Sequence, residues 1–189
     1  MSVVQGKPRD RRGQSMIALA MLLGCFIVAA IWLFACEVNR IQLAREQLQA
    51  AADAAALAAA AGLAKQNKTD PLDAHNEAMN IAMNTFRMNS VLGVSLSAVL
   101  MAADAYDCPA AGHASIFVEF LDPLNNNTPV TLGDPAGKIV RVTAAFGAQP
   151  AFGQFLAFGS MPVRVNSSRG YSGGSAPGKP AKRYGLHQR

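Results

Sequence analysis

Histidines are the side chains in this sequence best suited to metal binding or proton transfer. His75, His113 and His187 stand far apart along the chain, and none has an acid or cysteine at the spacing of a metal-ligand set. The sequence also contains no Gly-Lys-Ser phosphate loop. We therefore expect no metal site, no cofactor and no enzyme activity.

Oxygen ligands that could hold calcium gather in the loop 122–137. Asp122, Asn125, Asn127 and Asp134 lie there, but they lack the regular spacing of a calcium-binding loop. Asn, Asp and Gly are also the residues that reverse the chain in turns. Turn formation is the better explanation of this loop.

Asp53 is an acid set among alanines. Its carboxylate could bind an arginine or asparagine of a partner protein along a helix. The alternative is a helix charge that meets only water. We keep Asp53 as a candidate partner-binding residue.

An apolar run from Met16 to Cys36 contains no charge, Asn, Gln or proline. At about 1.5 Å per residue, a helix of this length reaches ~31 Å, close to the ~30 Å hydrocarbon thickness of a bilayer. A soluble helix must turn one face to water and has no need for such a run. We predict a membrane span over 14–36, in which Ala20 and Gly24 form a small pair for packing against another span.

Charge on the two sides of the span predicts its direction. The arm before it carries four bases against one acid, a net +3: Lys7, Arg9, Arg11 and Arg12 against Asp10. Short segments rich in Lys and Arg stay in the cytoplasm. We predict a cytoplasmic arm over 1–13, a single span in the inner membrane and a periplasmic remainder.

A cleaved leader is the alternative interpretation, since signal peptides also have a basic flank and an apolar core. Their apolar region is usually about 7–15 residues, shorter than this one. Two segments that end at Cys25 and Cys36 resemble a lipoprotein cleavage box. Cleavage would leave a periplasmic lipoprotein or a secreted binding domain. The first box would leave a long apolar stretch behind it, and the second has Phe34 where a small residue is preferred.

A helical stalk is predicted over 37–66, because Ala, Leu, Gln, Glu and Arg dominate there and proline is absent. Small or apolar residues recur on it with helical spacing, and we interpret them as a seam that packs against a partner helix. Replacement of Ala51 and Ala55 by Lys should then abolish partner co-purification and leave membrane insertion intact. The seam residues are Ile41, Ala44, Leu48, Ala51, Ala55, Ala58 and Gly62.

The fold class predicted is α+β, with an antiparallel sheet after a second helix in a domain over 67–168. Thr69 or Asp70 caps that helix, Pro71 suits its first turn, and it runs to about Asn89. Its apolar face consists of Leu72, Met79, Ala82, Met83 and Phe86.

Period-two or β-branched patterns predict strands over 94–100, 116–121, 138–146 and 162–166. The segment 147–160 fits no pattern. A composition of Gly, Ser, Pro and basic residues predicts a disordered tail over 169–189.

The net charge of +5 lies at the two ends of the chain. Between arm and tail there are eight bases against eleven acids, so the predicted domain is slightly acidic. This balance does not suit nucleic acid. Cys108 is the one cysteine outside the span, and we expect it to be buried or inert.

Arg12-Gly13 before the span and the alanine-rich Leu48–Ala60 around Asp53 are quite specific features. Over residues 11–64 the chain resembles the Tad (tight-adherence, Flp) pilus-assembly proteins of the TadE/TadG-like class. The resemblance implies a pilin-like layout and a bitopic inner-membrane protein with a periplasmic domain. It would work with a secretion-type machine that builds adhesive pili. Its expected partners are other Tad pilus-assembly membrane proteins or pilins, or a second copy bound through the alanine-rich helix.

Prepilin-like members of this class are cut after a glycine and keep a glutamate at the fifth mature position. If Gly13 were that glycine, Ala18 would stand at the fifth position. The residues therefore favour an unprocessed anchor. An exported hydrolase is a further alternative, and it would need a preorganised polar cluster.

Overall fold

The computed structural model describes residues 11–65, 70–104, 109–151 and 159–170. The chain divides into two compact units, residues 1–39 and 40–189. Helix α1, Arg11–Lys65, contributes residues to both. The first unit holds the apolar run, and the second holds all other described elements.

The first unit is a helix with apolar side chains on all sides. Every side chain from Ser15 to Trp32 is exposed, and Phe26 and Trp32 are each 65% exposed. A soluble protein buries most residues of this kind. Among the described residues, α1 is the one helix long and apolar enough to cross a membrane. The unit fits a membrane protein with a single N-terminal span.

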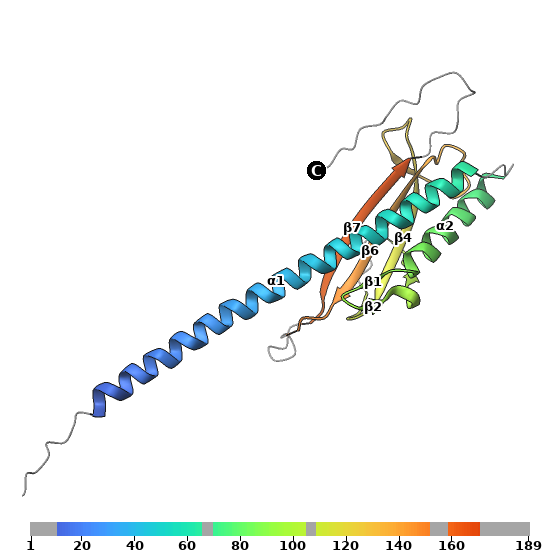
Figure 1. Cartoon of the computed structure of the whole chain (residues 1–189). Helices are drawn as coiled ribbons and strands as arrows, with labels where there is room; N and C mark the ends of the chain where they lie inside the picture. The colour runs from blue at the N-terminus through green and yellow to red at the C-terminus, as the bar shows by residue number, and fades with distance from the viewer. Residues whose placement is uncertain (1–10, 66–69, 105–108, 152–158, 171–189) are drawn as a thin grey trace, which may run out of the picture. The chain divides into compact units, whose positions relative to one another are not determined.

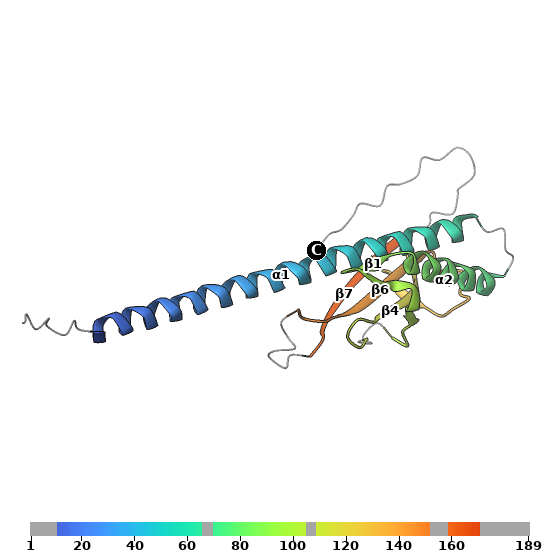
Figure 2. The ribbon, with the colours of Figure 1, turned by 60° about the horizontal axis from the view of Figure 1, so that its bottom comes forward.

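The second unit is built in two layers, with two helices on one face of a sheet (Figures 1 and 2). The C-terminal part of α1 and helix α2, Pro71–Arg87, form the helical layer. A long apolar N-terminal helix, a second helix and a small sheet confirm the predicted α+β class.

Residues at the two ends of helix α2 satisfy its terminal backbone groups. The Asp70 carboxylate accepts the N–H of Leu72 at 2.9 Å, with proline in the first turn, so the predicted N-cap is confirmed. The helix ends at Arg87, slightly before the predicted end. There the side-chain amide of Asn89 donates to the carbonyl of Thr85 at 2.9 Å and so satisfies one of the last carbonyls.

The main sheet has five strands, in the order β3-β4-β6-β7 with β5 paired to β4. β3 runs parallel to β4, and the other pairs are antiparallel, so the sheet is mixed rather than purely antiparallel. The strands predicted over 116–121, 138–146 and 162–166 are confirmed, and each ends later than predicted. The bounds are β3 Leu100–Met101, β4 Ala114–Asp122, β5 Thr128–Val130, β6 Ile139–Ala148 and β7 Met161–Gly170.

The strand predicted over 94–100 is wrong. Leu92 and Gly93 have φ of 51° and 78°, and they reverse the chain between the short strands β1, Ser90–Val91, and β2, Val94–Ser95. The Ser95 hydroxyl then accepts the N–H of Ser97 at 3.2 Å and caps a 3-10 turn, Leu96–Ala98. A serine that binds nearby backbone competes with strand pairing, and this competition breaks up the alternating pattern.

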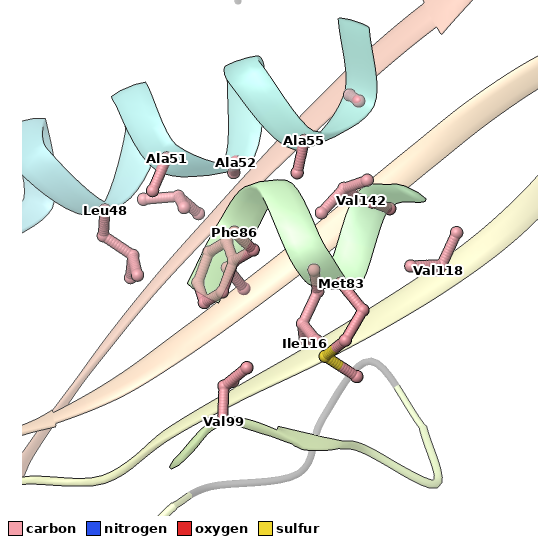
Figure 3. Packing of buried hydrophobic residues seen from close by; sticks show 14 of the residues in the cluster. Leu48, Ala51, Ala52, Ala55, Met83, Phe86, Val99, Ile116, Val118 and Val142 are labelled. Carbon is pink, nitrogen blue, oxygen red and sulfur yellow. The ribbon is translucent and has the colours of Figure 1, made fainter. Parts of the chain in front are cut away.

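The core lies between the helices and the inner face of the sheet (Figure 3). Ile116 and Val118 of β4 and Val142 of β6 belong to one buried cluster with Leu48 of α1 and Phe86 of α2. The cross-strand register places Val118 beside Val142, so the inward side chains of neighbouring strands lie level with one another.

The buried face of α2 differs from the predicted one at its start. Leu72 is 42% exposed, and His75 is buried in its place. The helical period allows either residue to lead the apolar face, and leucine is buried more often than histidine, so the sequence alone favours Leu72.

Strand β7 continues into the region whose composition predicted a tail. Its last residues, Arg169 and Gly170, pair with Val140 and Ile139 of β6. Ser167, just before them, is only 5% exposed. Residues 171–189 lie outside the described part of the chain.

Candidate functional site

The alanine seam of α1 is occupied by the chain's own core. Ala44, Leu48, Ala51 and Ala55 are each 0% exposed, and Ile41 and Ala58 are half-buried. The seam was predicted to face a partner helix, and that assignment is corrected: α2 and the sheet of the same chain cover it. Helical spacing shows that one face avoids water, but it does not show which surface covers that face.

Small residues on this face let the helices approach closely. A Cβ atom added at Gly62 would lie 2.6 Å from Cδ1 of Ile81 on α2, well inside van der Waals contact. The neighbouring buried alanines Ala52, Ala56 and Ala59 are each 0% exposed. The alanine-rich sequence is therefore explained by helix packing inside the second unit.

Asp53 binds its own chain. The side-chain amide of Gln49 donates to Asp53 Oδ1 at 3.1 Å, and the guanidinium of Arg169 on β7 lies 3.5 Å from the same oxygen. Gln49 also donates to the carbonyl of Asn166 on β7 at 3.0 Å. Because Asp53 and Arg169 are both more than one third exposed, their attraction contributes little stability by itself. These contacts place Gln49 and Asp53 of α1 beside the C-terminal half of β7.

A second polar tie joins α1 to the β1–β2 hairpin. The Gln47 side-chain carbonyl accepts the N–H of Leu92 at 2.7 Å. Leu92 stands at the positive φ of that turn, where its N–H has no strand partner. Sequence periodicity gave no sign of this contact, because the two residues are far apart along the chain.

The opposite face of α1 is the one that faces outward in the second unit. Leu43 is 47% exposed and Leu57 is 60% exposed, and the alanines between and after them, Ala50 and Ala61, are exposed as well. Residues four or seven apart lie on one side of a helix. This exposed stripe, Leu43, Ala50, Leu57 and Ala61, is defined here as the outer stripe of α1.

The small pair predicted in the span is accessible within the first unit. Ala20 and Gly24 are exposed, and a Cβ atom added at Gly24 would meet no atom within 4 Å. No packing contact inside this unit therefore requires a glycine at this position. Contact with another span stays a prediction.

His75 is the most unusual polar residue of the second unit. It is 3% exposed and stacks on the ring of Phe120 in β4, with centroids 3.9 Å apart and planes 6° from parallel. Its Nδ1 accepts the N–H of Gly133 at 3.0 Å, and its Nε2 lies 3.2 Å from the carbonyl of Gly137. Burial lowers the pKa of His75 below 6.5, against opposing effects of the Gly137 bond and the Asp134 charge.

The acids of the loop 122–137 make turns. Asp122 Oδ1 accepts the N–H of Leu124 at 2.8 Å, and Asp134 Oδ1 accepts the N–H of Ala136 at 2.9 Å. Asn126 and Asn127 have φ of 52° and 57°, a conformation that asparagine tolerates. The turn explanation is confirmed for these residues.

Within the described ranges, no three His, Cys, Asp or Glu side chains gather as a metal site would require. His113 is exposed just before β4, where its carbonyl accepts the N–H of Gly147 near the end of β6, whereas His75 lies on α2. His187, Cys108 and residues 152–158 of the segment 147–160 lie outside the described residues, so the predictions for them stay predictions.

Comparison with family models places part of the chain in a known family model. Residues 13–62 match the Tad model, described as Flp pilus-assembly TadE/G-like. The suspected resemblance is thereby confirmed over the span and the alanine-rich part of α1. No curated protein and no solved structure matched the chain.

Proposed function

We propose that this chain, whose α1 carries the Tad match, is a structural or assembly protein of a Tad-type (Flp) adhesive pilus machine. It would be anchored in the inner membrane by one span, with its second unit in the periplasm. The observation that carries this proposal is that the matched residues form the exposed apolar helix itself. The match to this family favours a structural role over an enzymatic one.

The orientation rests on charge. The Lys and Arg residues of the arm over 1–13 favour the cytoplasmic side, so the span over 14–36 would lead outward to the helix over 37–66, which packs into the second unit. The α+β domain over 67–168 would then meet its partners outside the cytoplasm. Cleavage to a lipoprotein or secreted form is the alternative.

Membrane anchoring predicts two results for the full-length protein. It should stay in the pellet when native membranes are washed with alkaline carbonate, and its intact mass should correspond to the uncut chain. Replacement of Ile27 and Ile31 by Asp should release it, since each acid costs about 2.5–3.5 kcal/mol at the centre of a span. A carbonate-soluble wild-type chain, or a mass shorter by more than twenty residues, would contradict the proposal.

The outer stripe of α1 is the surface we assign to a partner, namely the alanine-rich helix of another Tad-family membrane protein. The match covers this helix and ends before the sheet, so the helix is the part that the chain has in common with pilus-assembly proteins. Two proteins anchored in one membrane can align such helices side by side. Leu43 and Leu57 would supply most of the buried apolar area.

Replacement of Leu43 and Leu57 by Lys should reduce co-purification of Tad components from native membranes at least tenfold and leave the fold intact. Two lysines would remove apolar contact and add charge at the interface. Leu124→Lys is the matched control, because Leu124 is 90% exposed on the turn after β4, far from this stripe along the chain. Unchanged co-purification would exclude the outer stripe, and recovery of only this chain would point to a homo-oligomer.

A further inference from the structure

We infer that His75 makes the loop 131–138 responsive to pH: the neutral ring holds this loop against α2 and β4, and protonation of the ring releases it. The inference goes beyond pilus assembly and does not need the identity of any partner. It rests on the contacts of one buried ring with a loop distant in sequence.

The hydrogen bonds of His75 require the neutral ring. Nδ1 faces the N–H of Gly133, which can only donate, so this nitrogen must be an acceptor without a proton. Nε2 faces the carbonyl of Gly137, which can only accept, so the proton sits there. Both ring nitrogens are satisfied at the same time only in this one tautomer.

Protonation would break one of the two bonds. A second proton at Nδ1 would point at the N–H of Gly133, and two donors about 3.0 Å apart repel each other. The charged ring would also be held against Phe120 with almost no access to water. The cheapest way to hydrate the charge is to move the loop that covers the ring.

The loop is shaped to fit the ring closely. A Cβ atom added at Gly137 would lie 3.0 Å from Cε1 of His75 and 3.0 Å from Cβ of Phe120. Gly133 has φ of 91°, and a Cβ atom there would lie 3.2 Å from Cβ of Leu72. Two glycines therefore bring the backbone onto α2 at the two points where His75 binds it.

The bonds within the loop would survive its release. Asp134 donates its N–H to Thr131 and accepts the N–H groups of Ala136 and Gly137 through its side chain and carbonyl. Lys138 donates to the carbonyl of Leu121 at 3.1 Å and anchors the far end of the loop. The loop would move as a preformed turn about this anchor.

The charged side chains on the elements around the ring are all candidates for an effect on its titration. They are Asp73 and Glu77 on α2, Asp122 on β4, and Asp134 and Lys138 on the loop. Asp134 is the one whose charge reaches the ring, where it favours the protonated form and so opposes burial. Burial is the larger effect.

The direction of the pH effect follows from proton uptake. Below about 6.5, the ordinary value for histidine, an open loop lets the ring bind a proton that the closed loop excludes. The ratio of closed to open loop therefore falls by up to about tenfold for each pH unit of acidification. This continues until the ring is protonated in the closed state as well. Above this range the loop stays closed.

The test is hydrogen exchange of the full-length protein in detergent micelles, measured by mass spectrometry between pH 7.5 and pH 5. The variant H113Q/H187Q leaves His75 as the only histidine, since the chain has three. After correction for the intrinsic exchange rate, the amide of Gly133, which His75 holds, should lose protection by up to about tenfold per pH unit below 6.5, read from overlapping peptides over 131–138. Peptides from the centre of α2 should not.

His75→Gln supplies the control without a titrating group, and it should give the same corrected protection at every pH. A flat profile in H113Q/H187Q would overturn the inference, whether or not His75→Gln folds. Equal loss of protection in α2 would overturn it too, because the whole unit would then be opening. So would a pH response that persists in His75→Gln.

Discussion

Replacement of Ala51 and Ala55 by Lys will unfold the second unit instead of merely detaching a partner. Both alanines are 0% exposed beneath the sheet and α2. Each lysine would place an unpaired charge and three extra carbon atoms in a filled core, at a cost of about 3–5 kcal/mol for the charge alone. Two such changes cost about 6–10 kcal/mol before overpacking is counted, which is comparable to the whole stability of a typical domain, about 5–15 kcal/mol.

Urea unfolding of the full chain in detergent, followed by protease resistance of the second unit, measures this effect. Ala61→Lys is the matched control, because Ala61 is exposed on the same helix. It should change the free energy of unfolding by no more than about 0.5 kcal/mol. Cooperative unfolding of the double variant at the wild-type urea concentration would show that this face of α1 is not covered in the protein.

This prediction changes how a co-purification experiment is interpreted. Loss of a partner after mutation of Ala51 and Ala55 would report an unfolded unit, not a broken interface. Substitutions in the outer stripe separate the two effects, because Leu43 and Leu57 are exposed in the folded unit.

Gly147→Ala will destabilise the sheet by about 3 kcal/mol, a large effect for one methyl group. A Cβ atom at Gly147 would lie 2.8 Å from the carbonyl carbon of Ala110 and even closer to its oxygen. Both backbone groups of Gly147 are also hydrogen-bonded. Its carbonyl accepts the N–H of Gly112 at 2.8 Å, and its N–H donates to the carbonyl of His113 at 3.0 Å. No flexible side chain is there to move aside.

Gly170→Ala is the control for this change, since its Cβ atom would meet Ile139 Cγ1 at 3.5 Å, an ordinary contact. The midpoint of urea unfolding should fall in Gly147→Ala and stay near the wild-type value in Gly170→Ala. Equal midpoints for the two variants would show that the segment 109–113 does not pack on the end of β6.

The local features of the fold were predictable from sequence. Asp70 and the proline after it specify where α2 begins, whatever the rest of the chain does. The β-branched and aromatic residues of β4 and β6 likewise predict strands by themselves. Each of these predictions uses interactions within a few residues.

The features that sequence reasoning missed depend on distant segments. The alanine face of α1 was recognised as apolar, but only the tertiary structure shows that Leu48 meets Phe86 and the sheet within one chain. The surrounding alanines mark Asp53 as a candidate binding residue. Composition, however, assigns its partner Arg169 to a disordered tail, although Arg169 lies in β7. The glycines at 133 and 137 are the one signal in the sequence that could have led to His75, since they flank a turn able to approach another backbone closely.

The edge of strand β7 that faces away from β6 bears on how neighbouring copies of the protein can aggregate. Among the described residues it pairs with β6 alone, so its other border carries backbone groups able to recruit a foreign strand. Pro162 has no N–H to offer there, and Gln49 already occupies the Asn166 carbonyl. Two outward-facing positions of this strand are thereby closed to the backbone of a foreign strand, which lowers the tendency of neighbouring copies to aggregate through this edge.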